Sequence, residues 1–305
     1  LNFGGWFDTF RQGTLRGYTG MHTRGGSALA REGANLVIGP WGHWPGRKVG
    51  GLDFGDTAFV DQNALALRWF DHWLKGLDNG IGREPAVKLF VMGANEWRFE
   101  KEYPLARTSY RKLYLANGSG LSWNPPAGEA PPDRYIYDPD KLTNGPSILY
   151  NSAVLTEPLE VTGPVKAVLF ASSDAVDTDF VAKLLDVYPD GKAYRMASGI
   201  LRARYRNSVS RPEFLQPGKI YELQVDLIGT SNVFGKGHRI RLEVSSSDYP
   251  AFDRHLNTGD PFGTGVKAQI AHQAVFHSAT SASYILLPVI PALDSTKKTA
   301  YTSVN

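Results

Sequence analysis

Residues 34–43 read ANLVIGPWGH, and this stretch decides the fold class of the first part of the chain. Its apolar run stops at the pair Gly39-Pro40, which favours a sharp loop. A short apolar run that ends so abruptly is typical of a strand buried on both faces, as in a parallel sheet. We therefore predict a buried strand at residues 34–39 that leads directly into a loop carrying His43.

The segments on either side of this strand alternate between strand and helix. The chain opens with LNFGGWFDTF at residues 1–10, which is typical of the end of a buried strand, and on that ground we expect the sequence to be a fragment. At residues 57–77 apolar side chains recur at spacings of three and four, which predicts an amphipathic helix stopped by Asn79-Gly80. Residues 1–82 therefore read strand, helix, strand, helix.

After Pro85 the apolar period changes to two, which indicates half-buried strands. ILRARYR at residues 200–206 and RIRLEV at residues 239–244 show the alternation most clearly. Shorter runs of this kind, separated by turns rich in glycine and proline, lie at residues 87–91, 165–170, 180–187, 221–228 and 284–287. Many short strands predict a two-sheet sandwich, with a jelly roll as the favoured version, at residues 83–291. Residues 292–305 show no apolar period and are expected to be a surface tail.

The composition limits the classes of function. The 305 residues, 42% of them hydrophobic, suffice for one large or two ordinary domains. The net charge of +3 is spread over interspersed charges, so neither a nucleic acid nor a membrane is expected as partner. The sequence has no cysteine, which excludes disulfides, thiol catalysis and cysteine zinc sites. We expect a soluble protein without a cofactor, and leave open whether it is cytoplasmic or secreted.

Asp8 and His43 each follow a predicted strand and could carry chemistry. Triads of the α/β-hydrolase type run in the order Ser, Asp or Glu, His, on loops at the carboxyl edge of a parallel sheet. The two residues fit the last two places: the histidine would act as general base, and the aspartate would orient it. The alternative is that Asp8 caps the following helix and His43 is a structural loop residue. The spacing by itself does not decide between these.

Longer motifs follow one another along the first hundred residues: GGWFDTF (4–10), GPWGH (39–43), WFDHWLKG (69–76) and LFVMGANEWR (89–98). They resemble the landmarks of one family, the bacterial cocaine esterases and α-amino-acid ester hydrolases, which are related to the X-Pro dipeptidyl-peptidases. Residues 163–191, 199–206 and 245–259 resemble its C-terminal jelly-roll domain. The resemblance implies the end of an α/β-hydrolase domain followed by a jelly roll, with Asp8 as triad acid and His43 as triad base.

The nucleophile of such a triad is absent from the sequence. No Gly-x-Ser-x-Gly pentapeptide occurs, and the most similar stretch, GGSAL at residues 25–29, ends in leucine and follows Asp8. In the family the serine, the oxyanion donors and a helical cap precede the GWFD-like motif, so the resemblance implies that they lie upstream of Leu1. We expect the chain alone to be inactive and to partner the upstream half of the hydrolase domain, or to form a homo-oligomer through its exposed edge.

The resemblance also narrows the substrate. In the α-amino-acid ester hydrolases, acidic residues two and three positions after the triad aspartate help to hold the substrate ammonium, whereas this chain has Phe10 and Arg11 there. We therefore expect a small ester, amide or short peptide with an apolar or aromatic acyl group. The candidate pocket residues are aromatic, and core packing is the alternative for those next to the pair: Trp6, Phe7, Phe10, Trp41 and Trp44.

Three further features have ordinary interpretations. The carboxylates Asp174, Asp177 and Asp179 lack the glycine and glutamate of a calcium loop, and no metal is expected there. The loop around His255 is expected to be a hydrogen-bonded loop that packs on the hydrolase domain, and the arginines at positions 202, 204 and 206 a solvated strand face. The competing function is a jelly-roll module of the galactose-binding-like type that binds carbohydrate or protein without catalysis, and a degenerate family member is a third.

Overall fold

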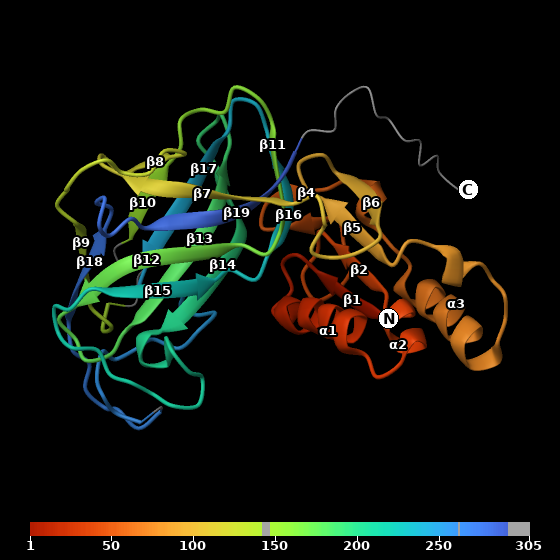
Figure 1. Ribbon diagram of the computed structural model, residues 1–305, viewed down its shortest axis with the longest axis horizontal. Coiled ribbons are helices and arrows are strands. Elements are labelled where there is room, and N and C mark those ends of the chain that lie inside the picture. The colour runs from red at the N-terminus through yellow and green to blue at the C-terminus, as the bar shows by residue number, and fades with distance from the viewer. Residues whose placement is uncertain (142–146, 262, 292–305) are drawn as a thin grey trace.

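The structure is a computed structural model that describes residues 1–141, 147–261 and 263–291. Figure 1 shows two parts side by side, one with helices and a small sheet, and one built from strands. The predicted tail at residues 292–305 lies outside the described residues. In the described part of the chain, no helix combines the length and the apolar character needed to cross a membrane.

The first part is built on a four-stranded sheet in the order β1-β2-β5-β6. Strands β1, β2 and β5 are parallel, and β6 is antiparallel to β5. The predicted strand at residues 34–39 is confirmed, because every residue of β2 is buried. The bounds of the four strands are Asn2–Gly5, Leu36–Gly39, Val87–Val91 and Glu96–Glu100.

Strand β5 corrects an expectation from the sequence. Residues 87–91 were predicted to belong to the sandwich, but Leu89 of β5 lies opposite Ile38 of β2 in a parallel pair. The physical reason is that both faces of β5 are covered: Val87, Leu89 and Phe90 are fully buried. The small sheet therefore extends past residue 82 to the end of β6.

Helices α1 (Arg11–Arg24) and α2 (Ala28–Glu32) lie along one side of this sheet, and α3 (Gln62–Lys75) lies at the end of the first part that is away from the strand part (Figure 1). Helix α3 is shorter than predicted, because Asp61 caps its start and Gly76, with a φ of 69°, ends it before Asn79. Residues Asp56–Ala58 form a separate 3-10 turn, and Ile81–Arg83 another. No residue of α3 is buried, and Leu74 is 77% exposed, so the apolar stripe that predicts this helix is uncovered.

The second part is a thirteen-stranded sheet that folds over itself. In Figure 1 strands β7, β12, β15 and β19 pass in front of β13, β14 and β17, and side chains of both layers share one core. Its strands are β7 (Ser109–Ala116), β8 (Gly120–Ser122), β9 (Asp133–Tyr137), β10 (Ile148–Asn151), β11 (Leu159–Gly163), β12 (Lys166–Ser173), β13 (Asp179–Val187), β14 (Ala193–Arg202), β15 (Tyr221–Asp226), β16 (Thr230–Phe234), β17 (Arg239–Ser245), β18 (Ala271–Phe276) and β19 (Tyr284–Ile290). A small hairpin, β3 (Lys48–Val49) and β4 (Leu52–Asp53), belongs to the first part of the chain.

The period-two pattern is confirmed in β17, where Ile240, Leu242 and Val244 are fully buried. It is wrong at residues 200–206, because β14 ends at Arg202 and Ala203–Tyr205 form a 3-10 turn. The predicted solvated arginine face is also wrong: Arg204 is only 7% exposed and pairs with the buried carboxylate of Asp177.

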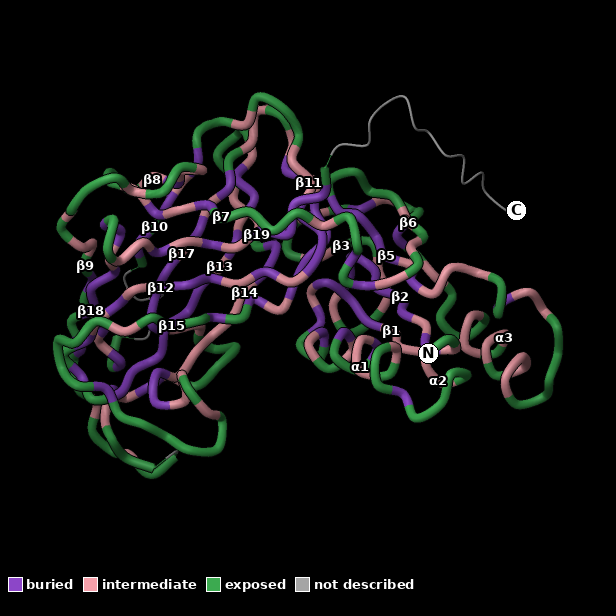
Figure 2. Tube along the Cα trace, viewed as in Figure 1, coloured by how far each residue is buried: buried purple, intermediate pink, exposed green. Residues whose placement is uncertain are grey.

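The two parts are joined by backbone hydrogen bonds and by one core. Met92, directly after β5, receives a hydrogen bond at its carbonyl from Val233 (2.8 Å) and donates to the carbonyl of Ser231 (3.0 Å). Arg98 of β6 pairs with Glu160 of β11. Buried residues continue from the small sheet into the strands of the second part, as the purple segments of Figure 2 show. The junction therefore fixes the small sheet against the strands.

Candidate active site

The loops that carry Asp8 and His43 lie at the carboxyl ends of the neighbouring parallel strands β1 and β2. The last residues of these strands, Gly5 and Gly39, lie opposite each other. Beyond them the pairing continues, because Trp6 donates to the carbonyl of Gly39 (2.8 Å) and Phe7 donates to that of Trp41 (3.0 Å). Backbone hydrogen bonds thus fix the two loops relative to each other.

Two glycines allow this close approach. A Cβ on Gly5 would lie 2.0 Å from the carbonyl oxygen of Trp41, and a Cβ on Gly39 would lie 2.2 Å from the indole ring of Trp41. The backbone cannot move aside for such an atom, and the outer edge of the Trp41 indole has no room to do so because the residue is 1% exposed. The glycines of the GGWFD and GPWGH motifs are therefore a steric requirement of the two loops.

Asp8 and His43 form a hydrogen-bonded pair, with 3.3 Å between Nδ1 of the imidazole and Oδ2 of the carboxylate. The other carboxylate oxygen accepts from the backbone N–H of Phe10 (3.0 Å). The Asp8 side chain is 7% exposed and that of His43 is 57% exposed. Helix α1 has no side-chain cap, so Asp8 is not its N-cap. The pair leaves Nε2 of the imidazole without another hydrogen-bond partner in the described structure.

A contact between histidine and aspartate is common in this chain, so exposure is the informative measurement. The four other pairs are His238–Asp186, His255–Asp177, His272–Asp174 and His277–Asp133. In three of them the histidine is largely buried, and in His272–Asp174 both side chains are more than half exposed. Within the described residues, Asp8–His43 alone joins a buried carboxylate to an exposed imidazole, which is the arrangement that a general base needs.

Two of the five candidate pocket aromatics are core residues. Trp6 is fully buried, and its Nε1 donates to the carbonyl of Phe90 in β5 (2.8 Å). Trp41 is 1% exposed and stacks on Phe3, with ring centroids 5.6 Å apart. Both residues thus anchor the paired loops to the sheet.

The other candidates lie at the surface or at its margin. Phe10 and Trp44 are 63% and 76% exposed, and their rings stand edge-on to His43 with centroid distances of 5.3 and 5.1 Å. Phe7 is partly buried and packs near Phe54 at 6.2 Å. The two rings that flank His43 are thus available to contact an apolar group brought to the imidazole.

Arg11 is a buried residue next to the site. It is 6% exposed, and its Nη1 donates to the carbonyl of Trp6 beneath the loop of Asp8. Burial lowers the pKa of this guanidinium to about 10. The position three residues after Asp8 therefore belongs to the support of the site, which the sequence analysis missed.

Residues 79–286 match the family model described as the X-Pro dipeptidyl-peptidase C-terminal non-catalytic domain. The chain belongs to this family. Asp8 and His43 precede the matched residues.

The relatives of this X-Pro dipeptidyl-peptidase-type chain are esterases and peptidases by name. It is 37% identical to the cocaine esterase of Rhodococcus sp. (strain MB1 Bresler), over 94% of this chain and 55% of that protein. It is 27% identical to a putative Xaa-Pro dipeptidyl-peptidase of Bacillus anthracis, over 64% of this chain and 34% of that protein. The chain thus spans about half the length, or less, of the curated relatives it matches.

Solved structures confirm the predicted resemblance. An α-amino acid ester hydrolase superposes with a TM-score of 0.82 at 30% identity, covering 93% of this chain and 54% of that one. An aminopeptidase from a marine sediment archaeon, Thaumarchaeota archaeon, superposes with a TM-score of 0.84 at 28% identity, covering 95% and 54%. The chain is accordingly a C-terminal part of a member of the superfamily that contains the cocaine esterases, the α-amino-acid ester hydrolases and the X-Pro dipeptidyl-peptidases.

Ser27, the residue in the stretch most similar to a nucleophile motif, has a structural role in this family member. It is the N-cap of α2, and its hydroxyl accepts from the backbone N–H of Ala30 (3.1 Å). It is not part of the Asp8–His43 pair.

The carboxylates considered for a metal each have a basic partner in this X-Pro dipeptidyl-peptidase-type domain. Asp174 pairs with His272, and Asp179 with Arg202. Asp177 binds Arg204 and His255; burial raises its pKa, but these partners outweigh burial and leave the pKa below the ordinary value. Among the described residues, no group of three or more histidine, aspartate or glutamate side chains is placed to hold a metal ion.

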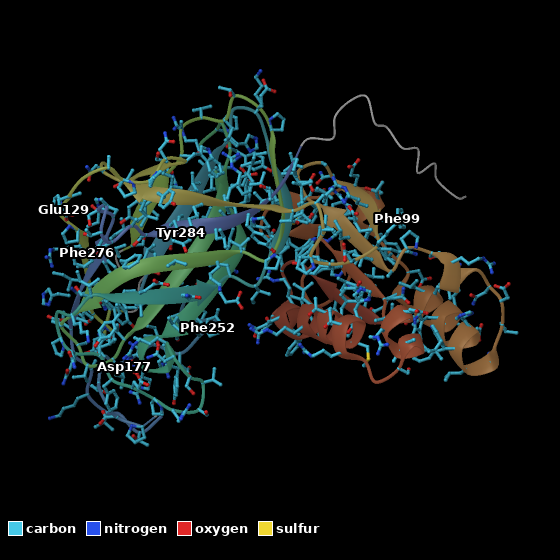
Figure 3. All side chains as sticks on the ribbon, in the orientation of Figure 1. Phe99, Glu129, Asp177, Phe252, Phe276 and Tyr284 are labelled. Carbon is cyan, nitrogen blue, oxygen red and sulfur yellow. The ribbon has the colours of Figure 1, made fainter. Side chains whose placement is uncertain are left out.

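The loop around His255 is hydrogen-bonded, as predicted. The backbone N–H of Asn257 donates to Nδ1 of His255 (2.8 Å), while Nε2 lies 2.8 Å from Asp177. Its other bonds run within the strand part of the domain, and none reaches residues 1–82 in the described structure. Figure 3 shows Asp177 at the end of the strand part that lies away from the helices. The predicted packing on the hydrolase domain is therefore not formed with residues 1–82, and packing on the upstream part of that domain stays a prediction.

Proposed function

We propose that this chain forms the C-terminal part of a serine hydrolase that cleaves acyl ester or amide bonds. Asp8 and His43 are its triad acid and base, and the serine belongs to a segment upstream of Leu1. Residues 1 to about 100 then complete an α/β-hydrolase domain, and the thirteen-stranded part is a jelly roll. The observation that carries this proposal is the pairing of a buried Asp8 with an exposed His43 at the carboxyl ends of adjacent parallel strands.

The geometry supports a definite division of labour. The backbone N–H of Phe10 donates to the Asp8 carboxylate and fixes it, and the same carboxylate accepts a hydrogen bond from Nδ1–H of His43. This second bond selects the tautomer in which Nε2 is free to accept a proton, and it stabilises the imidazolium that then forms. His43 Nε2 then takes the proton of the serine as its oxygen attacks the acyl carbon, and returns that proton to the leaving group. The upstream segment also supplies the donors for the oxyanion.

An open strand edge and an apolar hollow on the first part of the chain support the proposal that another segment packs there. In the described residues β1 has a strand on one side only. Beside its open edge, Leu1, Met21, Leu29 and Trp73 help to line a hollow. An open edge and uncovered apolar side chains favour association. We expect the isolated chain to bind the upstream half of the domain or to associate with itself, and a stable monomer by light scattering would contradict this.

The exposed rings of Phe10 and Trp44 favour an apolar or aromatic acyl group. The positions two and three residues after Asp8 are Phe10 and Arg11, and neither side chain has a carboxylate that could bind a substrate ammonium. Free α-amino substrates are therefore disfavoured, and small esters or amides without that charge are the expected class.

The test is hydrolysis of p-nitrophenyl acyl esters by the chain alone and by the polypeptide extended upstream in its reading frame. We expect turnover from the extended form only. Asp8→Asn should lower kcat by about 10⁴-fold, and His43→Ala should abolish turnover above background. His272→Ala is the matched control, because His272 is equally exposed and also bound to an aspartate.

Two results would overturn the proposal. Activity that survives His43→Ala in the extended form would remove the triad. An extended form that is inactive over a range of acyl groups would favour the competing function, a carbohydrate- or protein-binding module, and glycan binding would then be measured.

A further inference from the structure

A cavity lies in the strand part, beside the loop around His255, and neither Asp8 nor His43 lines it. Its volume of about 260 Å³ is just below the range of about 300–1,000 Å³ that holds drug-sized ligands, so it suits a ligand of about one ring. The lining comes from the end of β14 with the 3-10 turn that follows, and from the loop after β17. It includes Arg202, Tyr205, Asp253, Arg254 and Thr258.

A network of buried hydrogen bonds holds these two segments together. Arg204 and His255 line the cavity, are both buried, and bind the same carboxylate, that of Asp177. Arg204 also donates to the carbonyls of Thr258 and Asp260 (3.0 Å each), which belong to the other segment of the lining. The cavity is therefore formed before a ligand arrives, which lowers the cost of binding.

Charged groups of both signs line the cavity without pairing with each other. Asp253 is exposed and has neither a hydrogen bond nor an ion pair in the described part of the chain. Asp260 accepts a hydrogen bond from the hydroxyl of Thr258 (2.9 Å), and Arg254 donates to the carbonyl of Pro139. An anion would be repelled by the carboxylates, and a cation by the guanidinium. A neutral hydroxyl, which both donates and accepts, can bind to both.

Tyr205 adds an aromatic ring to this lining. Its hydroxyl has no hydrogen bond within the residues that the structure describes. An aromatic side chain offers an apolar face and, in tyrosine, a polar tip. A carboxylate, a guanidinium and an aromatic ring in one small cavity thus match a ring that carries several hydroxyls and has an apolar C–H face.

We propose that this cavity binds one neutral sugar ring, whose hydroxyls contact Asp253 and Arg254 and whose C–H face packs on Tyr205. A free monosaccharide and the end of a glycan chain share this chemistry. The site goes beyond the proposed hydrolase function and does not depend on it, because none of its residues belongs to residues 1–82. Figure 3 shows Asp177, the partner of two lining residues, at the end of the strand part away from the helices.

The test is saturation-transfer difference NMR of the 305-residue chain and of the extended polypeptide. The probes are glucose, galactose and mannose, each as the free sugar and as the methyl glycoside. We expect transfer to the ring protons of at least one sugar, with a Kd of about 1 mM, which is ordinary for a ligand with so few atoms. Binding of a methyl glycoside supports the end of a glycan chain, and binding of the free sugar alone supports a monosaccharide.

Asp253→Ala assigns the signal to the cavity. It should weaken binding about tenfold or more, because a hydrogen bond to a charged group is lost. Since the Asp253 side chain has no partner among the described residues, its removal leaves folding intact, and thermal unfolding checks this. Asp190→Ala is the matched control: Asp190 is an exposed aspartate of the same part that does not line the cavity, so this variant should bind like the unsubstituted chain.

Three results would overturn the inference. The first is an absence of transfer from all of the sugars at about ten times the expected Kd. The second is transfer of the same size in Asp253→Ala, which would place the sugar elsewhere. Inorganic phosphate is the probe for the opposite chemistry: phosphate binding that is lost in Arg254→Gln, without binding of any sugar, would show an anion site.

Discussion

Replacement of Asp177 by alanine should lower the stability of the strand part more than the removal of one partner from an exposed ion pair. The carboxylate of Asp177 is fully buried and accepts from the backbone N–H of Arg204 (2.8 Å), from Nε of Arg204, and from Nε2 of His255 (2.8 Å). Arg204 is only 7% exposed. Asp177→Ala therefore leaves a guanidinium buried without its counter-charge.

The size of the effect follows from these contacts. Breaking a buried pair by removing one partner costs about 3–5 kcal/mol, because the remaining charge stays desolvated. Arg204 also donates to the carbonyls of Thr258 and Asp260, which keeps it in place after the substitution and favours the upper part of that range. We expect a loss of about 4–5 kcal/mol in the free energy of unfolding.

The measurement is urea unfolding of Asp177→Ala against the unsubstituted chain. Asp190→Ala is the control, since Asp190 forms an exposed pair with Lys192 and its removal should leave the unfolding midpoint unchanged. If both substitutions shift the midpoint equally little, the buried network contributes no more than a surface pair, and the reasoning is refuted.

The same residue sets a pH dependence. The folded-state pKa of Asp177 lies below the ordinary value of 3.8, because His255 and Arg204 outweigh burial. The folded state then binds fewer protons than the unfolded state, so the stabilisation is present above the unfolded pKa and is lost as pH falls through the lower folded pKa. Stability should decline below about pH 4 in the unsubstituted chain and decline less in Asp177→Asn.

Three further predictions concern the first part of the chain. Gly39→Ala should cost about 3 kcal/mol of stability or more because its Cβ meets the indole of Trp41, whereas Gly42→Ala, which has open space, should not, as denaturant unfolding will tell. Ser27→Ala should cost about 1 kcal/mol through loss of the helix cap and leave ester hydrolysis by the extended polypeptide unchanged. Phe10→Ala should lower kcat/KM for a benzoyl ester about three- to tenfold relative to an acetyl ester. Equal losses for both esters would show that Phe10 does not contact the acyl group.

The sequence predicts an element well where its signal is local. Strands β2 and β17 follow from a continuous apolar run and from strict alternation, and neither signal depends on distant residues. Strand β5 shows the limit: VKLFV at residues 87–91 is a short apolar run in any sheet, and only its pairing with β2 shows which sheet it joins. That pairing brings together residues some fifty positions apart, and no periodicity encodes it.

Charged residues were the other source of error. The alternation of Arg202, Arg204 and Arg206 with apolar residues is what a solvated strand face looks like. The carboxylates of Asp177 and Asp179 bind two of these arginines from more than twenty positions earlier in the chain. A buried ion pair cannot be predicted from the sequence in this way, since a charged residue is expected to be exposed as long as its distant partner is unknown.

The candidate site was predictable in part, for a reason that the glycines explain. Asp8 and His43 contact each other because β1 and β2 end in register, and that register requires the absence of a Cβ at Gly5 and Gly39. The glycines of the two motifs are therefore sequence signals of the same geometry that the acid and base need. Arg11 carries no such signal, because only the start of α1 turns its side chain beneath the loop. The contact of two loop residues is thus predictable where the backbone constrains it, whereas the burial of a charged residue such as Arg11 becomes apparent only in the structure.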